Sequence, residues 1–196
     1  MYVKYKIEPL FKIEFFKLKC CNFERKKKDI EQTLKRTAFR EKRQVNFSTN
    51  RHKKRNVTLQ VKDVDIEMSL AYDLRDIFYH EFNLMEKKFH ANVNVYDAWS
   101  VTYNKGDYHE PHNHGSTGYS GILYLDMHEK SPVTTYIQPW NNEKDKSVLC
   151  KPCVEEGDIV IVPQYLMHYT DPNPVNFKKR IISFDFNLDY DFKFTI

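Results

Sequence analysis

Three of the chain's eight histidines fall in the ten-residue stretch GDYHEPHNHG, residues 106–115. Imidazole adds little to packing or solubility but is a good ligand for iron, zinc, nickel and copper. If the HNH part is extended, as Pro111 favours, His112 and His114 point to one side, because side chains two apart on a strand share a face. His109 falls on the opposite parity. The stretch therefore predicts a metal site that uses His112 and His114.

A third ligand has to come from another part of the chain. Four further histidines occur in basic, helical or turn-like contexts without a matching partner: His52, His80, His90 and His128. His168 differs, because it follows the apolar stretch DIVIVP and precedes the turn-forming residues DPNP. Arg180 opens another apolar stretch, RIISFDF, where burial of a charge is costly unless it binds an anion. His168 and Arg180 are thus singled out.

The elements that must position these residues are mostly strands. Apolar, turn-bounded segments predict strands at 92–104, 119–127, 134–140, 158–163 and 180–188. Short strands at this spacing, without a convincing helix between them, are typical of a sandwich or barrel of the jelly-roll kind.

The first 90 residues have a different character. The best helix is expected at 63–82, a weaker one at 23–39, and extended pieces around Pro9 and at 56–61. We expect a mainly β (α+β) fold in a single structural domain. Residues 1–90 would form a basic layer of strands and helices packed on a β core over residues 91–196.

The charge of the chain is unevenly distributed. Residues 1–60 carry 18 Lys+Arg against 6 Asp+Glu, whereas residues 61–196 carry 13 against 21. A basic region of this strength is compatible with a nucleic-acid, ribosomal or acidic protein partner. The alternative is a basic helical face next to an acidic body.

Cysteine usage and hydropathy point to the cytoplasm. The sequence CKPC contains Cys150 and Cys153, which could be half of a zinc site or a redox motif, but Cys20 and Cys21 have the wrong spacing to complete one. Inert thiols are therefore expected. No apolar stretch reaches the roughly 18 residues of a membrane span, and charges interrupt the opening MYVKYKIEPLFKIEFF. Neither a membrane contact nor a signal peptide is expected.

Four stretches taken together carry a family resemblance. YNKGDYHEPHNHG, SGILYLDM, GDIVIVPQYLMH and RIISFDF, within residues 96–188, resemble the double-stranded β-helix of the 2-oxoglutarate/Fe(II)-dependent oxygenases. The likeness is greatest to the prolyl-4-hydroxylase-like branch and its small bacterial and phage-type members. It implies a jelly-roll, cupin-like core and an enzyme that uses Fe(II), 2-oxoglutarate and O2. Such an enzyme hydroxylates a C–H bond while decarboxylating 2-oxoglutarate to succinate and CO2.

The resemblance also implies roles for individual residues. Tyr103 and Gly106 occupy the Tyr-x-x-Gly lead-in of the family, so that His112 matches the first metal ligand and His114 the carboxylate ligand. His168 matches the distal histidine. Arg180 matches the basic residue that pairs with the far carboxylate of 2-oxoglutarate, and Tyr103 and Tyr124 are candidates for a hydrogen bond to the same co-substrate.

The sequence departs from the family at the second ligand, which is histidine instead of aspartate. A three-histidine site keeps the full +2 charge of the metal, which favours a dianionic co-substrate but also admits Zn, Ni or Cu. Alternatively, His114 stays unbound. Ile182 stands where a serine often follows the basic residue, and Ser183 has the wrong parity to replace it.

Other residues near the site have less defined roles. His109 and Asn113 could orient the ligands or contact substrate, Trp140 could line the entrance, and the polar segment 141–156 could be a lid.

Two other functions are compatible with the same residues. One is a three-histidine cupin-type dioxygenase or isomerase that needs no 2-oxoglutarate, and therefore no Arg180. The other is a non-enzymatic basic binding module on a barrel scaffold. The prime substrate is left open between a peptidyl side chain, a free amino acid, a nucleobase and a small metabolite.

Overall fold

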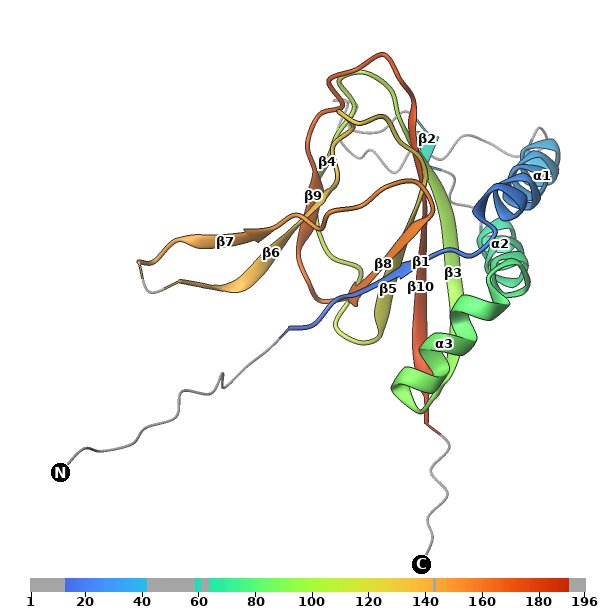
Figure 1. Ribbon diagram of the computed structural model, residues 1–196, viewed down its shortest axis with the longest axis horizontal. Helices are drawn as coiled ribbons and strands as arrows, with labels where there is room; N and C mark the ends of the chain where they lie inside the picture. Colours follow the sequence, from blue (N-terminus) through green and yellow to red (C-terminus); the bar gives the residue numbers. More distant parts are fainter. Residues whose placement is uncertain (1–12, 42–58, 61–63, 143, 191–196) are drawn as a thin grey trace, which may run out of the picture.

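The computed structural model describes residues 13–41, 59–60, 64–142 and 144–190. Figure 1 shows two antiparallel sheets that face each other. The larger sheet has the order β1-β8-β5-β10-β3-β2, formed by Phe16–Lys19, Asp158–Pro163, Tyr119–Asp126, Lys179–Asp189, Asn92–Tyr103 and Leu59–Gln60. The smaller sheet has the order β4-β9-β6-β7, formed by His109–His112, His168–Thr170, Thr134–Asn141 and Ser147–Cys150.

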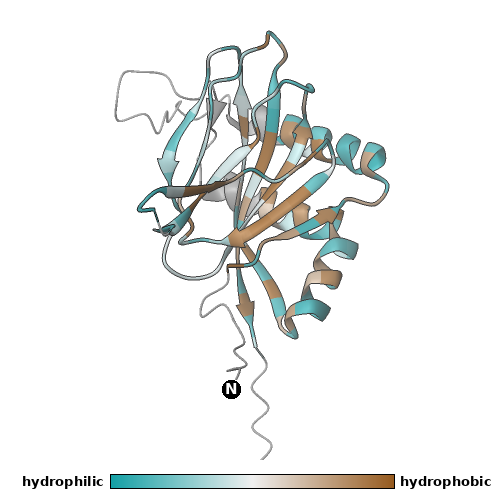
Figure 2. Ribbon diagram, turned by 60° about the vertical axis from the view of Figure 1, so that its left-hand side comes forward, coloured by the Kyte–Doolittle hydropathy of each residue, from teal (hydrophilic) through white to brown (hydrophobic). Residues whose placement is uncertain are grey.

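The central strands of the larger sheet are buried on both faces. Their sequences, such as YSGILYLD in β5 and DIVIVP in β8, are nearly continuous apolar runs of β-branched and aromatic residues. One face packs against helices, with Ile30, Leu74, Phe82 and Phe184 in its core. The other faces the smaller sheet. Figure 2 shows the apolar residues gathered on these central strands.

Three helices cover the outer face of the larger sheet: α1 (Phe23–Glu41), α2 (Val64–Ile77) and α3 (Tyr79–Phe89) (Figure 1). The single helix expected over 63–82 is therefore two helices. The chain breaks at Phe78, where φ is −103° and ψ 26°, and α3 then continues past Phe82 until His90 ends it in a left-handed conformation. None of the helices described is both long and apolar enough to span a membrane.

Part of the polar segment after β6 forms a strand. Ser147–Cys150 form β7, which pairs with β6 through the register Ile137↔Leu149 and Asn141↔Ser147. The two strands make a hairpin that projects from the body of the molecule (Figure 1). Residues 147–150 of the segment 141–156 are therefore a strand instead of a loop, and a role of the segment as a lid stays a prediction.

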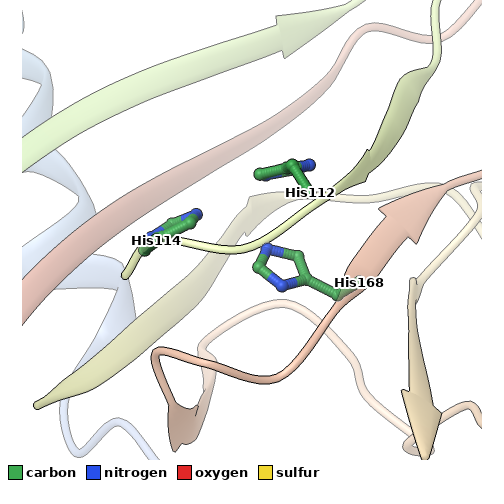
Figure 3. Close-up of side chains that lie close together, drawn as sticks. All are labelled: His112, His114 and His168. Carbon is green, nitrogen blue, oxygen red and sulfur yellow. The ribbon is translucent and has the colours of Figure 1, made fainter. Parts of the chain in front are cut away.

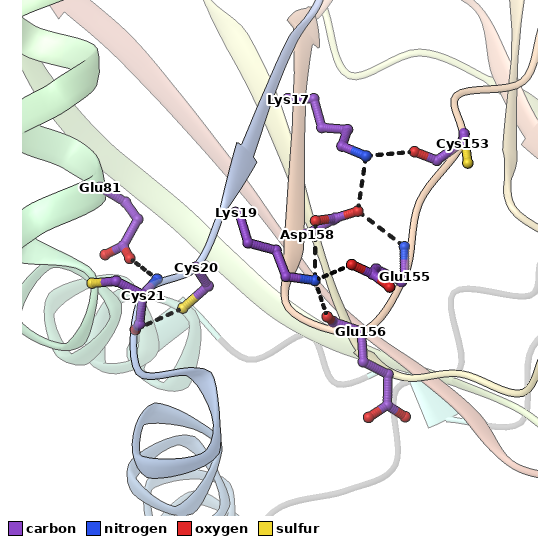
Figure 4. A network of polar contacts seen from close by, with 9 residues as sticks. All are labelled: Lys17, Lys19, Cys20, Cys21, Glu81, Cys153, Glu155, Glu156 and Asp158. Atoms are coloured by element: carbon purple, nitrogen blue, oxygen red, sulfur yellow. Dashed lines mark hydrogen bonds and ion pairs between the residues drawn. The ribbon is translucent and has the colours of Figure 1, made fainter.

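Several cations of the basic N-terminal third lie against carboxylates of the acidic core. Lys17 pairs with Asp158 at 3.2 Å between Nζ and Oδ2, and Lys19 with Glu155 at 2.7 Å between Nζ and Oε1 (Figure 4). Lys27 pairs likewise with Asp126, at 2.7 Å. This is a basic layer next to an acidic body. The basic run 51–55, with His52, and the expected strands around Pro9 lie outside the described residues.

The mainly β jelly-roll fold with helices packed on it is confirmed. Its two cores differ in composition. The core under the helices is aliphatic and phenylalanine-rich. The core between the sheets contains the hydroxylated aromatic side chains Tyr103, Tyr124 and Tyr136 together with Trp99. It is this second core that opens onto the histidines.

Candidate active site

The structure brings His112, His114 and His168 together. His112 ends β4 and His168 begins β9, and the two are paired across the antiparallel ladder. His114 follows two residues after His112. One imidazole nitrogen from each residue lies within 4.8 Å of those of the other two, and Figure 3 shows the three rings around a common space. Within the part of the chain that the structure describes, this is the one group placed to hold a metal ion.

Hydrogen bonds orient all three rings in the same way. Nδ1 of His112 lies 2.7 Å from the carbonyl oxygen of Glu110, and Nδ1 of His168 lies 2.9 Å from the carbonyl oxygen of Leu166. Nδ1 of His114 lies 2.8 Å from Oδ1 of Asp185. Because carbonyl and carboxylate oxygens accept, each Nδ1 is assigned the proton. Each Nε2 is then left with its lone pair, and the three residues fit a metal as neutral nitrogen donors.

The protonation of His168 agrees with that role. The residue is buried, and this burial, together with the neighbouring His112, lowers its pKa to about 3. At neutral pH its imidazole is therefore uncharged, which is the form that binds a metal.

His109 is not on the far side of the strand. Its ring centroid lies 3.9 Å from that of His112, with 30° between the planes. The register of β4 against β9 shifts between His109 and His112, and such an irregularity breaks the simple alternation of faces. The parity expected for His109 is corrected, and its side chain lines the same cavity as the other three.

The cavity next to the histidines lies between the two sheets and encloses about 290 Å³ of empty space, solvent at its mouth included. Its walls come from β3, β5, β6, β9 and β10, through the residues Trp99, Val101, Tyr103, Ile122, Thr134, Thr170, Ile181 and Ser183. The mixture of apolar walls and a few polar groups suits a small polar ligand.

A lysine that sequence reasoning missed lies deep between the sheets. Lys179 is 0% exposed, and its Nζ is 4.6 Å from the ring centroid of Tyr103 and 5.9 Å from that of Tyr124. Among the described residues Nζ has no hydrogen-bond partner. Burial lowers the pKa of this lysine to about 7. A buried cation without a partner is costly, so the position calls for an anion.

Arg180 does not take the place expected for it. Its guanidinium pairs with Asp126 of β5 and with Glu31 of α1, on the helix-covered face of the sheet. Lys179 is its neighbour on β10 and so points to the opposite face, together with Ile181 and Ser183 of the cavity wall. Arg180 is therefore engaged on the other face, and Lys179 is the cation that faces the space between the sheets. Counted from Lys179, the position where a serine often follows the basic residue is occupied by Ile181.

Tyr103 and Tyr124 flank Lys179. Both are buried, and this burial raises the pKa of each phenol above its usual range. Tyr103 is the cross-strand partner of Lys179, and the hydroxyl of Tyr124 accepts from the backbone N–H of Thr134 at 3.4 Å. Their contact with a co-substrate stays a prediction.

The remaining candidates lie away from the cavity. Asn113 is exposed, and Trp140 is 44% exposed near the tip of the β6–β7 hairpin. Cys150 and Cys153 are free and exposed, and neither joins the histidine group. Cys20 is also free, and burial raises the pKa of its thiol to about 12, as expected for an inert thiol.

The sequence of the core matches a known family. Residues 97–187 fit the model of a family described as "Putative 2OG-Fe(II) oxygenase". No curated protein matches the sequence.

The fold is shared with several solved structures. AviO1 from Streptomyces viridochromogenes Tue57 superposes with a TM-score of 0.63 at 15% identity, over 89% of this chain and 90% of that one. The α-ketoglutarate-dependent epimerase SnoN from nogalamycin biosynthesis gives 0.62 at 10% identity, over 89% and 77%. HygX from Streptomyces hygroscopicus, solved with nickel and 2-oxoglutarate bound, gives 0.58 at 13% identity, over 89% and 83%. At these identities the likeness establishes the double-stranded β-helix alone.

Proposed function

We propose that residues 97–187 form the core of a 2-oxoglutarate/Fe(II)-dependent oxygenase, in which His112, His114 and His168 hold the iron while Lys179 binds the far carboxylate of 2-oxoglutarate. When bound, the iron activates O2, so that decarboxylation of 2-oxoglutarate to succinate and CO2 is coupled to oxidation of a substrate C–H bond.

The observation that carries the metal assignment is the common orientation of the three imidazoles. Each ring has its Nδ1 held by an oxygen acceptor, two of them backbone carbonyls, so that Nε2 is the nitrogen left for a metal in each ring. Surface histidines that met by chance would not share this arrangement. Nitrogen ligands of this kind suit iron, and they also suit nickel and zinc.

The observation that supports the co-substrate assignment is the unpaired ammonium of Lys179. 2-Oxoglutarate is a dianion, and its far carboxylate would supply the charge that Lys179 lacks. The rings of Tyr103 and Tyr124 flank the lysine, and their hydroxyls are the nearest candidates for a second contact. Val101, Ile122 and Ile181 in the cavity wall keep water away from the pair, which strengthens it.

For the prime substrate we propose a small molecule. Two of the similar structures contain one: SnoN is in complex with nogalamycin RO, and HygX with hygromycin B. A nucleic-acid or ribosomal partner has less support, because Lys17, Lys19 and Lys27 of the basic third are engaged by core carboxylates. Four free thiols suit the cytoplasm, which we propose as the location.

The test compares two adjacent cations on one strand. The apoprotein is titrated anaerobically with Fe(II) and 2-oxoglutarate, and formation of the metal-to-ligand charge-transfer band is followed. Lys179→Met is expected to weaken 2-oxoglutarate binding about 10- to 100-fold, the loss typical of a charge-assisted contact. Arg180→Met, the matched control, should bind within a few-fold of the unmodified protein.

The opposite result would return the anchor to Arg180. A protein that forms no band, and that turns over substrate with metal alone, would favour the cupin-type reaction without 2-oxoglutarate. Retention of metal after His112→Ala and His168→Ala would contradict the metal assignment itself.

A further inference from the structure

His114 stands where the family has a carboxylate ligand, and a carboxylate lies directly behind it. Oδ1 of Asp185 on β10 is 2.8 Å from Nδ1 of His114, on the side of the ring away from Nε2. Ser120 on β5 is the cross-strand partner of Asp185, and its Oγ is 2.9 Å from the same Nδ1 and 2.6 Å from Oδ1 of Asp185. Asp185 is 6% exposed and Ser120 2%.

With Asp185 ionised, the triangle needs a proton on Nδ1 of His114. If Nδ1 of His114 carries the proton, it donates to the carboxylate, and the hydroxyl of Ser120 donates to the same oxygen. If Nδ1 were unprotonated, its lone pair would face a carboxylate lone pair at 2.8 Å. For the neutral ring, the triangle thus favours the tautomer of His114 that leaves Nε2 free.

The charges of the site point the same way. Asp185 is buried, and among the ion pairs of the described residues its partner is His114, not a lysine or arginine. A buried carboxylate without a compensating charge is costly. Three neutral imidazoles, in turn, leave the +2 charge of a metal uncompensated. A bound metal would compensate Asp185 through His114, and Asp185 would compensate the metal.

We propose that Asp185 is a positioning residue that supplies, through the ring of His114, the negative charge that the family's carboxylate ligand would otherwise bring to the metal. Ser120 holds the carboxylate in place. Trp99, whose ring centroid is 5.3 Å from that of His114, packs on the imidazole and limits its rotation. The inference rests on the proposed metal site and explains how this chain tolerates histidine at the second position.

The first measurement is metal affinity, without turnover. Fe(II) or Co(II) is titrated anaerobically against a competing chelator. Asp185→Asn should weaken binding about 10- to 100-fold, the range typical for partners behind a ligand. The control is Asp126→Asn, which removes a carboxylate of the neighbouring strand that pairs with Lys27 and Arg180 on the other face. It has the same change of charge and should bind within about threefold of the unmodified protein.

The second measurement asks whether Asp185 acts through His114. In a His114→Asp background the ligand brings its own charge, and a carboxylate at Asp185 would repel it. Asp185→Asn should then leave metal affinity unchanged or improve it. A merely structural role predicts the same loss in both backgrounds, and that result would overturn the proposal. An unchanged affinity of Asp185→Asn in the natural background would do so as well.

A third readout needs no metal. In the apoprotein with 15N-labelled histidine, the nitrogen shifts of His114 should report the Nδ1–H tautomer, and Asp185→Asn should shift the population toward Nε2–H. If that variant does not fold, Ser120→Ala keeps the carboxylate and removes its hydroxyl donor; a loss of affinity of about three- to tenfold is expected, and no loss would contradict the proposal. Failure of the metal site as a whole is recognised separately, because the unmodified protein would then bind no metal.

Discussion

The two faces of β10 perform different tasks with residues that alternate along one strand. Lys179, Ile181, Ser183 and Asp185 face the smaller sheet: Ile181 and Ser183 line the cavity, Asp185 contacts His114, and Lys179 lies over the ring of Tyr103. Ile182, Phe184 and Phe186 face the helices and belong to the aliphatic and aromatic core. The face toward the smaller sheet, here called the site face, contains Lys179 and Asp185, which among the described residues form no ion pair with a side chain of Asp, Glu, Lys or Arg. The face toward the helices, here called the helix face, contains apolar groups and, at its partly exposed edge, the ion pairs of Arg180. Along this strand, the residues on one face therefore serve mainly stability, and the residues on the other face serve mainly the site.

The largest effect is expected from the helix face. Phe184 is buried against Phe82 in an edge-to-face contact with ring centroids 5.7 Å apart. Phe184→Ala should lower the free energy of unfolding by about 3–5 kcal/mol, as is typical when a buried phenylalanine is removed. Chemical denaturation measures this. The affinity of the folded fraction for 2-oxoglutarate should stay within about twofold; a large loss of affinity would show that the faces are not separable.

The site face predicts the opposite sign. Lys179→Met replaces a buried cation without a partner by an apolar side chain of similar length. The free energy of unfolding of the apoprotein should rise by about 1–3 kcal/mol at pH 7, because the cost of burying the charge disappears. The same variant is expected to have a lower affinity for 2-oxoglutarate. If the variant were less stable than the unmodified protein, the packing contacts of the Lys179 side chain would stabilise the fold by more than its buried charge costs.

The pH dependence sharpens this prediction. Lys179 has a pKa of about 7 in the fold, whereas an unfolded lysine titrates near 10.4. Between these two values the unfolded chain binds more protons, so the Lys179 contribution to stability rises with pH; below pH 7 its full cost is present. The advantage of the Lys179→Met variant should therefore shrink by about 1 kcal/mol from pH 7 to pH 8. An advantage that stays constant would contradict the lowered pKa.

The sequence predicted the jelly-roll core from the spacing of its strands and singled out His112, His114 and His168 by residue type, whereas the family resemblance implied that the three share one metal site. The sequence did not reveal which residues of β10 face the smaller sheet and which face the helices. A strand that is buried on both faces reads as a continuous apolar run, RIISFDF, so its alternation leaves no trace in hydropathy. Arg180 is singled out in the sequence because it opens this run and matches the basic residue of the family, whereas Lys179 stands just outside the run.

Other differences have tertiary causes. The bulge that places His109 beside His112 depends on how β4 pairs with β9. The polar β7 is a strand because β6 pairs with it, and not because of its own propensity. Asp185 could not be connected with His114, since the two are 71 residues apart in the chain.

The smallest effect is expected for Arg180→Met, the control on the outer rim of the helix face. Its partners Asp126 and Glu31 are themselves partly exposed, so water screens the pairs and each contributes little. Asp126 also keeps Lys27. The variant should lose less than about 1 kcal/mol of the free energy of unfolding, and more of this at low than at high salt, because the pairs are screened. Denaturation at two salt concentrations measures both quantities. A loss of several kcal/mol that salt does not change would show that Arg180 is important for the stability of the fold. The Arg180→Met variant would then be a poorer control for Lys179→Met.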